Sequence, residues 1–232
     1  KPRQFWSEKL SEATVTAECF SQLHVPTAGR LPQTLELTMT PERIATAEKF
    51  AAELHRLTNE IEMWQTEKNR AAAASFGIAQ DHHAAIVFLL KNTFHSSSFA
   101  LLRSLFEAYL RGLWLKHCAT GAQVSAFFRG GEPPKNMVAE IESTEAFTGG
   151  VLSRIKKENW GAMCAFTHTG GLHLQRWQSQ DGVEPTFVPE ELEECLNCAE
   201  LFGAMAGLEL VQLSKSGANG SDVLQLMKTR WP

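Results

Sequence analysis

Four charged or titratable side chains share one face of the most apolar stretch of the sequence. Arg103, Glu107, Arg111 and His117 all lie within the stretch 99–118. At about 100° per residue, a helix places them at about 0°, 40°, 80° and −40°, within an arc of about 120°. Because a buried and unpaired charge costs several kcal/mol, a stable fold must either pair these groups or hydrate them.

The two guanidinium groups on this face outnumber the one carboxylate. Glu107 is spaced to pair with Arg103 one turn before it and with Arg111 one turn after it. We therefore expect either a second acid nearby in the fold or an arginine that faces a wet cleft. The first alternative is an internal network that fixes the helix register. The second is a site for phosphate, carboxylate or an RNA backbone, since arginine is the preferred residue for such anions.

Three histidines outside this stretch are further candidates. His168 stands at the predicted end of a helix, where the helix dipole favours the protonated ring. It is either a helix cap beside Gly170-Gly171 or a general acid or base next to the arginine face. His173 follows across the same turn, and we count it as a ligand-binding candidate. His83 lies on the inward face of another predicted helix, either as a satisfied core residue or as a ligand-binding group.

The histidines and cysteines lack the spacings of known metal and cofactor motifs. Asp81, His82 and His83 do not form a His-Glu-x-x-His pattern with the later histidines, so we predict no metal site. Cys195 and Cys198 form a single C-x-x-C, whereas a zinc ribbon needs a second pair. Because no phosphate-binding loop or dinucleotide fingerprint occurs either, we predict no cofactor.

The composition is that of an ordinary globular protein. The 232 residues are 44% hydrophobic and 21% charged, and the formal net charge is −4. This charge argues against a surface that coats nucleic acid, but it leaves room for a local basic cleft. Arg103, Glu107 and Arg111 within 99–118 argue against a transmembrane segment, because each costs roughly 2.5–3.5 kcal/mol at the membrane centre. We expect no membrane partner, and reduced thiols in the cytoplasm.

Apolar residues recur at helical spacing along most of the chain, which predicts an all-α bundle of about five to seven helices. We predict an irregular N-terminal arm over residues 1–38 and one helical-bundle domain over 39–232. Residues 174–177 and 184–188 have the pattern of a small β-hairpin. The first clear helix start is Thr40-Pro41. Longer predicted helices, with apolar residues at the same spacing, follow at residues 70–94, 99–118, 151–167 and 189–215.

The run Ala100-Leu-Leu-Arg103-Ser-Leu-Phe-Glu107-Ala-Tyr-Leu-Arg111-Gly-Leu-Trp-Leu115, together with Thr167-His168-Thr169-Gly170-Gly171, resembles an uncharacterised family of bacterial helical proteins. The resemblance covers about residues 40–215. It implies an all-helical fold but no established activity.

The spacing Arg111-x-x-x-x-x-His117 is similar to the catalytic motif of HEPN domains. These domains are dimeric helical bundles, and many are metal-independent ribonucleases of toxin–antitoxin and phage-defence systems. The sequence departs from their pattern because Gly112 stands where a polar residue is usual, and because the motif falls on a central helix.

Two functions remain open at this stage. In the first, the chain is a HEPN-like, metal-independent endoribonuclease or toxin or defence component that forms a homodimer. Arg111 or Arg103 would hold the scissile phosphate, and His117 or His168 would act as acid or base. In the second, the chain is a non-catalytic module that dimerises or binds an anionic ligand. Small residues in the stretch 203–207 would then pack the last long helix on a partner.

Overall fold

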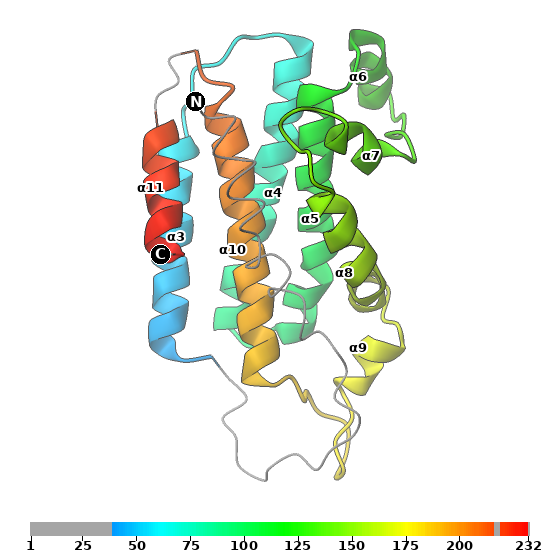
Figure 1. Ribbon diagram of the computed structural model, residues 1–232. Coiled ribbons are helices and arrows are strands. Elements are labelled where there is room, and N and C mark those ends of the chain that lie inside the picture. Colours follow the sequence, from blue (N-terminus) through cyan, green and yellow to red (C-terminus); the bar gives the residue numbers. More distant parts are fainter. Residues whose placement is uncertain (1–38, 216–218, 232) are drawn as a thin grey trace.

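Four long helices run side by side and enclose the core (Figure 1). The computed structural model describes residues 39–215 and 219–231, so the predicted arm over residues 1–38 lies outside the described residues. Within the bundle, α4 packs against the other three long helices, and α10 packs against α3 and α5. The four helices are α3 (Pro41–Thr58), α4 (Glu67–Lys91), α5 (His95–His117) and α10 (Pro189–Val211).

Five shorter helices cover this centre. Helix α8 lies along α5, while α11 lies against α3 and α10 on the opposite side of the bundle (Figure 1). Helix α6 contacts α4, α7 contacts α5 and α8, and α9 contacts α8. Their bounds are α6 Gly121–Phe128, α7 Met137–Glu142, α8 Val151–Thr167, α9 Gly171–Gln175 and α11 Gly220–Arg230.

The prediction of an all-α bundle is confirmed. The described residues form nine helices, more than the five to seven expected, because α7 and α9 are only six and five residues long. The predicted β-hairpin is wrong. Leu174 lies inside α9, and the returning chain bonds back only at Thr186 N to Arg176 O and within the turn. The division into an arm and one domain stays a prediction.

Threonine side chains fix where several helices begin. The Thr40 hydroxyl accepts from the backbone N–H of Arg43 at 3.2 Å, as its position before Pro41 predicts. Thr66 caps α4 in the same way through Asn69, at 3.1 Å, so this helix begins earlier than the expected residue 70. Because the threonine supplies the acceptor that the first turn lacks, it decides the boundary more strongly than the apolar pattern.

Small residues let the long helices approach closely. A Cβ atom added to Gly203 of α10 would lie 2.5 Å from Nδ1 of His83 on α4. One added to Gly207 would lie 2.7 Å from a Leu54 methyl group, and one added to Gly112 of α5 would lie 2.4 Å from the Phe76 ring. The small residues of α10 therefore pack inside the chain. Our expectation that they meet a partner is wrong.

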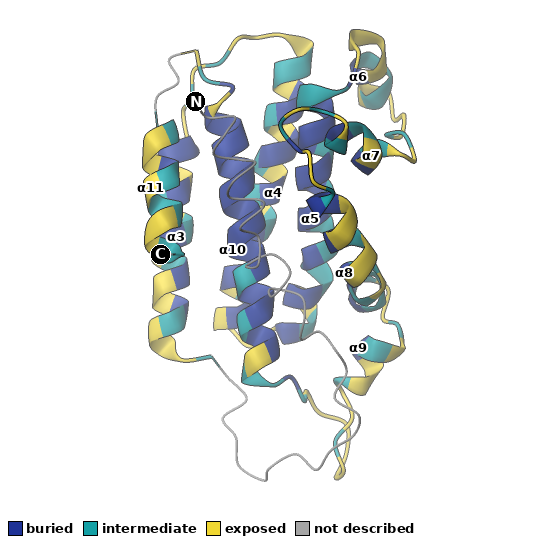
Figure 2. Ribbon diagram, viewed as in Figure 1, coloured by how far each residue is buried: buried dark blue, intermediate teal, exposed yellow. Residues whose placement is uncertain are grey.

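Helices α5 and α10 are the most deeply buried elements (Figure 2). Their neighbours cover them on nearly every side, which explains why 99–118 is apolar around almost its whole circumference. Within residues 39–215 and 219–231, no helix combines the length and apolar character needed to cross a membrane.

Candidate anion-binding site

The candidate site lies where α8 packs along α5. Lys156 and Trp160 lie one turn apart on α8, and His168 caps the C-terminal end of that helix two turns further on, so the three residues lie along one side of α8 at the edge of its contact with α5. The end of α8 lies next to Ala100, because the Thr167 hydroxyl shares its hydrogen between Met163 O of α8 at 2.8 Å and Ala100 O of α5 at 3.1 Å. This contact brings the last turn of α8 next to the first charged residue of α5.

Arg103 is held by three different groups. Its Nε donates to Oε1 of Glu107 at 2.8 Å, and its Nη1 donates to Nε2 of His168 at 2.6 Å. The guanidinium carbon also lies 4.7 Å from the centre of the Trp160 ring, in a cation–π contact. With both edges and one face engaged, this guanidinium is fixed in one orientation.

The contact with Arg103 decides the tautomer of His168. An arginine has donors only, so the ring nitrogen that faces it must accept and carries no proton. The remaining hydrogen is then on Nδ1, and the ring is neutral in this geometry. We expected the helix end to favour the protonated ring, but a protonated ring would set two donors against each other here.

Glu107 is shared between two arginines. Its second oxygen, Oε2, accepts from Nη2 of Arg111 at 2.7 Å, so both carboxylate oxygens are engaged. Among the described residues, no second acid bonds either arginine, and Nε and Nη1 of Arg111 have no hydrogen-bond partner. The Arg111 side chain is 38% exposed, against 19% for Glu107. The face therefore carries one positive charge in excess at its more open end.

The turn after α8 positions His168 without a glycine in the left-handed conformation. Thr169 adopts that conformation, with φ 53°, and the N–H of Gly170 bonds to Ala165 O at 2.7 Å. His173 completes the cap, because its Nδ1 donates to the Phe166 carbonyl at 3.0 Å. The expected glycine cap is therefore wrong in detail. Gly170 is needed because it packs closely on Ala165: a Cβ atom added to Gly170 would lie only 3.1–3.4 Å from atoms of Ala165.

A family model matches residues 76–229, which contain α5, α8 and α10 and all of the site described above. The chain belongs to the family of unknown function DUF6988. No curated protein and no solved structure matched the chain. The predicted membership of an uncharacterised family is thus confirmed, and the DUF6988 match itself names no activity.

In this DUF6988 chain, His117 lies apart from the arginine pair. Its Nε2 is 3.2 Å from Oε2 of Glu209, and its ring packs edge-on against Phe147. Within the described part of the chain, no hydrogen bond or ion pair joins His117 to Arg111. Six residues turn the helix by about −120°, which explains the separation. The HEPN-like spacing is therefore present in the sequence, but the two side chains have different partners.

The carboxylate of Glu209 ties α10 to the end of α5. It accepts from Lys116 Nζ at 2.7 Å as well as from His117, and its side chain is almost fully buried. Burial alone would raise the pKa of Glu209, but the bond from His117 and the charge of Lys116 outweigh burial and lower it. The carboxylate stays ionised, so this cluster holds two helices together.

His83 lies between α3, α4 and α10, outside the site. Burial lowers its pKa from 6.5 to about 4, so the ring is neutral near pH 7. Within the part of the chain that the structure describes, no three histidine, cysteine or acidic side chains are grouped in a way that could hold a metal ion.

Trp160 and Lys156 were missed from the sequence. Lys156 Nζ lies 5.1 Å from the Trp160 ring, which Arg103 also faces. Stepping back from His168 by two helical turns identifies Trp160, so the same helical spacing that picked out Arg103, Glu107 and Arg111 could have found it.

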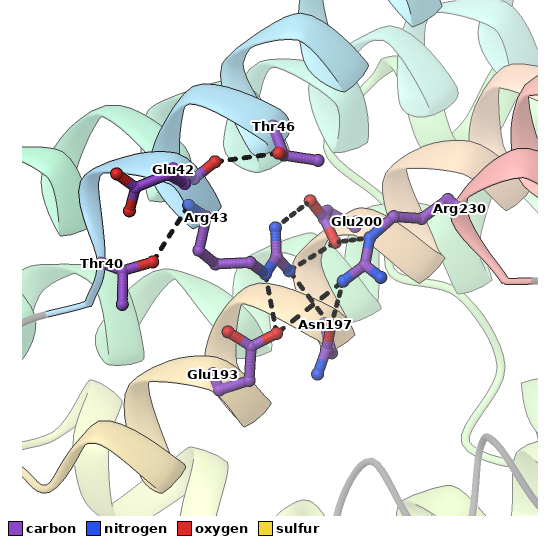
Figure 3. A network of polar contacts seen from close by, with 8 residues as sticks. All are labelled: Thr40, Glu42, Arg43, Thr46, Glu193, Asn197, Glu200 and Arg230. Atoms are coloured by element: carbon purple, nitrogen blue, oxygen red, sulfur yellow. Dashed lines mark hydrogen bonds and ion pairs between the residues drawn. The ribbon is translucent and has the colours of Figure 1, made fainter.

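A buried charge cluster was also missed (Figure 3). Glu200 of α10 is 0% exposed and accepts from both Arg43 of α3 and Arg230 of α11. Asn197 accepts from the same two guanidinium groups, and Glu193 bonds Arg43 at 2.7 Å. The charges balance, so this cluster fastens α11 to the bundle. The helical spacing of two acids and an amide at positions 193, 197 and 200 of α10 was the available signal.

Proposed function

We propose that the chain binds an anionic group, a phosphate or a carboxylate, at the face formed by Arg103, Glu107, Arg111 and His168. The main support for this proposal is that one carboxylate, Glu107, pairs with two arginines, while two donor nitrogens of Arg111 have no partner among the described residues. An anion placed there would complete the neutralisation of the face. The planar fork of arginine matches two oxygens of such a ligand.

The two arginines would have different roles in the proposed site. Arg103 is immobilised by Glu107, His168 and Trp160, so it supplies a fixed positive charge. Arg111 is held at a single nitrogen and is more exposed, so it can turn toward a ligand at little cost. Lys156, beside Trp160, adds a further positive charge at the same junction of α5 and α8.

Titration with inorganic phosphate, followed by calorimetry, tests this proposal. We expect Arg111→Gln to weaken phosphate binding by about tenfold or more, because a charge-assisted bidentate contact is lost. Glu107→Gln should strengthen binding, since it removes the competing carboxylate. Arg154→Gln, an exposed arginine elsewhere on α8, is the matched control and should bind as the wild type does. Unchanged affinity in Arg111→Gln would rule the site out.

A second candidate is metal-independent RNA cleavage, with the scissile phosphodiester as the bound anion. It is favoured by the 2.6 Å contact between Arg103 and Nε2 of His168, which places a neutral imidazole beside a phosphate-binding cation. Once Arg103 turns from Nε2 to the phosphate, the freed Nε2 would take the proton of the attacking 2′-hydroxyl. A 2′,3′-cyclic phosphate forms as the bond to the 5′-oxygen breaks and that oxygen takes a proton from water, while Arg103 would stabilise the charge on the phosphorus oxygens. A toxin or defence role belongs to this candidate.

RNA cleavage in EDTA separates the two candidates. If the second is right, His168→Ala should lower the cleavage rate by about 100-fold or more, a typical contribution of acid–base catalysis. His117→Ala should leave the rate close to that of the wild type, because Glu209 holds that ring elsewhere. No cleavage by the wild type, or equal rates in wild type and His168→Ala, would leave anion binding alone.

The expected homodimer stays a prediction. Ile78 and Phe88 are exposed on α4, so one face of this helix presents apolar side chains outside the bundle, which supports a contact with a second copy.

A further inference from the structure

Helices α5 and α8 run in opposite directions, and their contacts fix which residues lie at the same level along the seam between them (Figure 1). Near the start of α5, the Thr167 hydroxyl contacts the Ala100 carbonyl. One turn further along α5, Arg103 lies over the ring of Trp160, two turns back along α8. In such an antiparallel pair, each residue forward on α5 corresponds to one residue back on α8, because both helices rise about 1.5 Å per residue.

This register places Lys156 of α8 at the level of Arg111 of α5. Arg111 is eleven residues after Ala100, and Lys156 is eleven residues before Thr167, so each lies about 16 Å along the seam from that contact. Both side chains are partly buried. The seam therefore carries one cation from each helix at the same level.

The two cations also point the same way along the seam. Nη2 of Arg111 reaches back one turn to Glu107. Nζ of Lys156 reaches forward one turn, to 5.1 Å from the centre of the Trp160 ring. Because the helices are antiparallel, backward on α5 and forward on α8 are the same direction, so both charged groups lie toward the level of Glu107.

The charges at this level do not balance. Three positive charges, on the two arginines of the site and on Lys156, face the single carboxylate of Glu107. Within the described residues, no acid forms an ion pair with Lys156. The next acid on this side, Glu140, accepts the indole N–H of Trp114, about one turn beyond Arg111. The seam therefore has two positive charges in excess beside Glu107.

We propose that the ligand of this site carries two negative charges on one group, as a phosphate monoester does, and that Lys156 selects it. The inference rests on the proposed anion site and narrows the class of its ligand. A dianion would neutralise both excess charges, whereas a carboxylate or a phosphate diester carries one charge and would leave one cation unpaired. The fork of Arg111 would bind two oxygens, and the ammonium of Lys156 would bind a third as a point charge.

Methyl phosphate and dimethyl phosphate separate these classes, because at pH 8 the first is a dianion and the second a monoanion. We expect calorimetry to show that the wild type binds methyl phosphate about tenfold or more tightly than dimethyl phosphate. Lys156→Gln should lose most of this preference and still bind dimethyl phosphate, because Arg111 stays in place.

Lys157→Gln is the matched control, since Lys157 is exposed and lies about 100° away round the same helix. It should keep the wild-type preference, and so should Lys156→Arg, which retains the charge. Equal binding of the two esters by the wild type, or an unchanged preference in Lys156→Gln, would overturn this inference and leave the anion site standing. If neither ester bound to the wild type, the proposed anion site would fail as well.

Discussion

Replacing Glu200 by alanine is expected to lower the free energy of unfolding by about 3–5 kcal/mol, because it leaves two largely buried guanidinium groups with only the partly exposed Glu193 as counter-charge. Glu200 is fully buried and bonds Arg43 through both of its oxygens and Arg230 through one (Figure 3). These bonds join α3, α10 and α11. Besides the loss of stability, we therefore expect faster amide exchange in α11.

Urea unfolding and hydrogen exchange measure this effect, and the same cluster contains its control. Glu193 also bonds Arg43, but its side chain is 39% exposed. Water can replace that carboxylate, so Glu193→Ala should cost no more than about 1 kcal/mol. If the two variants lose equal stability, or if α11 keeps its exchange rates in Glu200→Ala, the cluster does not fasten α11 as described.

Acidification should destabilise the chain through His83. Burial lowers the pKa of this ring from 6.5 to about 4. Between these two pH values the unfolded chain binds a proton that the folded chain excludes, so stability falls as the pH falls. The contribution is fully present above pH 6.5, and by pH 4 about 3 kcal/mol of it is lost.

Unfolding free energies at a series of pH values between 7 and 4.5 test this prediction. Most of this range lies above 4.5, the ordinary pKa of a glutamate in the unfolded chain, and the pKa of Glu209 in the folded chain is lower, so Glu209 contributes little to the slope. His83→Leu should show a much shallower loss of stability across the range than the wild type. His55→Gln, which replaces an exposed histidine of α3, should keep the wild-type slope. Equal slopes in wild type and His83→Leu would contradict the burial of a neutral ring.

Local signals in the sequence account for most of the helices. The Thr40-Pro41 start of α3 was predicted because capping needs only neighbouring residues. The hairpin over 174–177 and 184–188 was wrong because a short alternating pattern is not specific, and Leu174 joins a helical turn beside His173. The early start of α4 followed from Thr66, a cap that the apolar pattern does not contain.

The candidate site was predictable as far as it depends on one helix. The pairing of Glu107 with Arg103 and Arg111 follows from spacing alone. The approach of His168 to Arg103 was expected as one of two alternatives, and it required α8 to pack on α5. The partners of His117 and Glu200 come from helices far apart in the sequence, so no local pattern fixes them.

The central claim is that the face between α5 and α8 binds an anion through the free edge of Arg111. A crystal soaked in tungstate, whose metal scatters anomalously and whose oxygens resemble those of phosphate, tests it directly. We predict an anomalous peak within hydrogen-bonding reach of Arg111, with the Arg103 guanidinium still against Trp160 and His168. A carboxylate of the chain bonded to the free edge of Arg111, with no peak beside it, would contradict the claim.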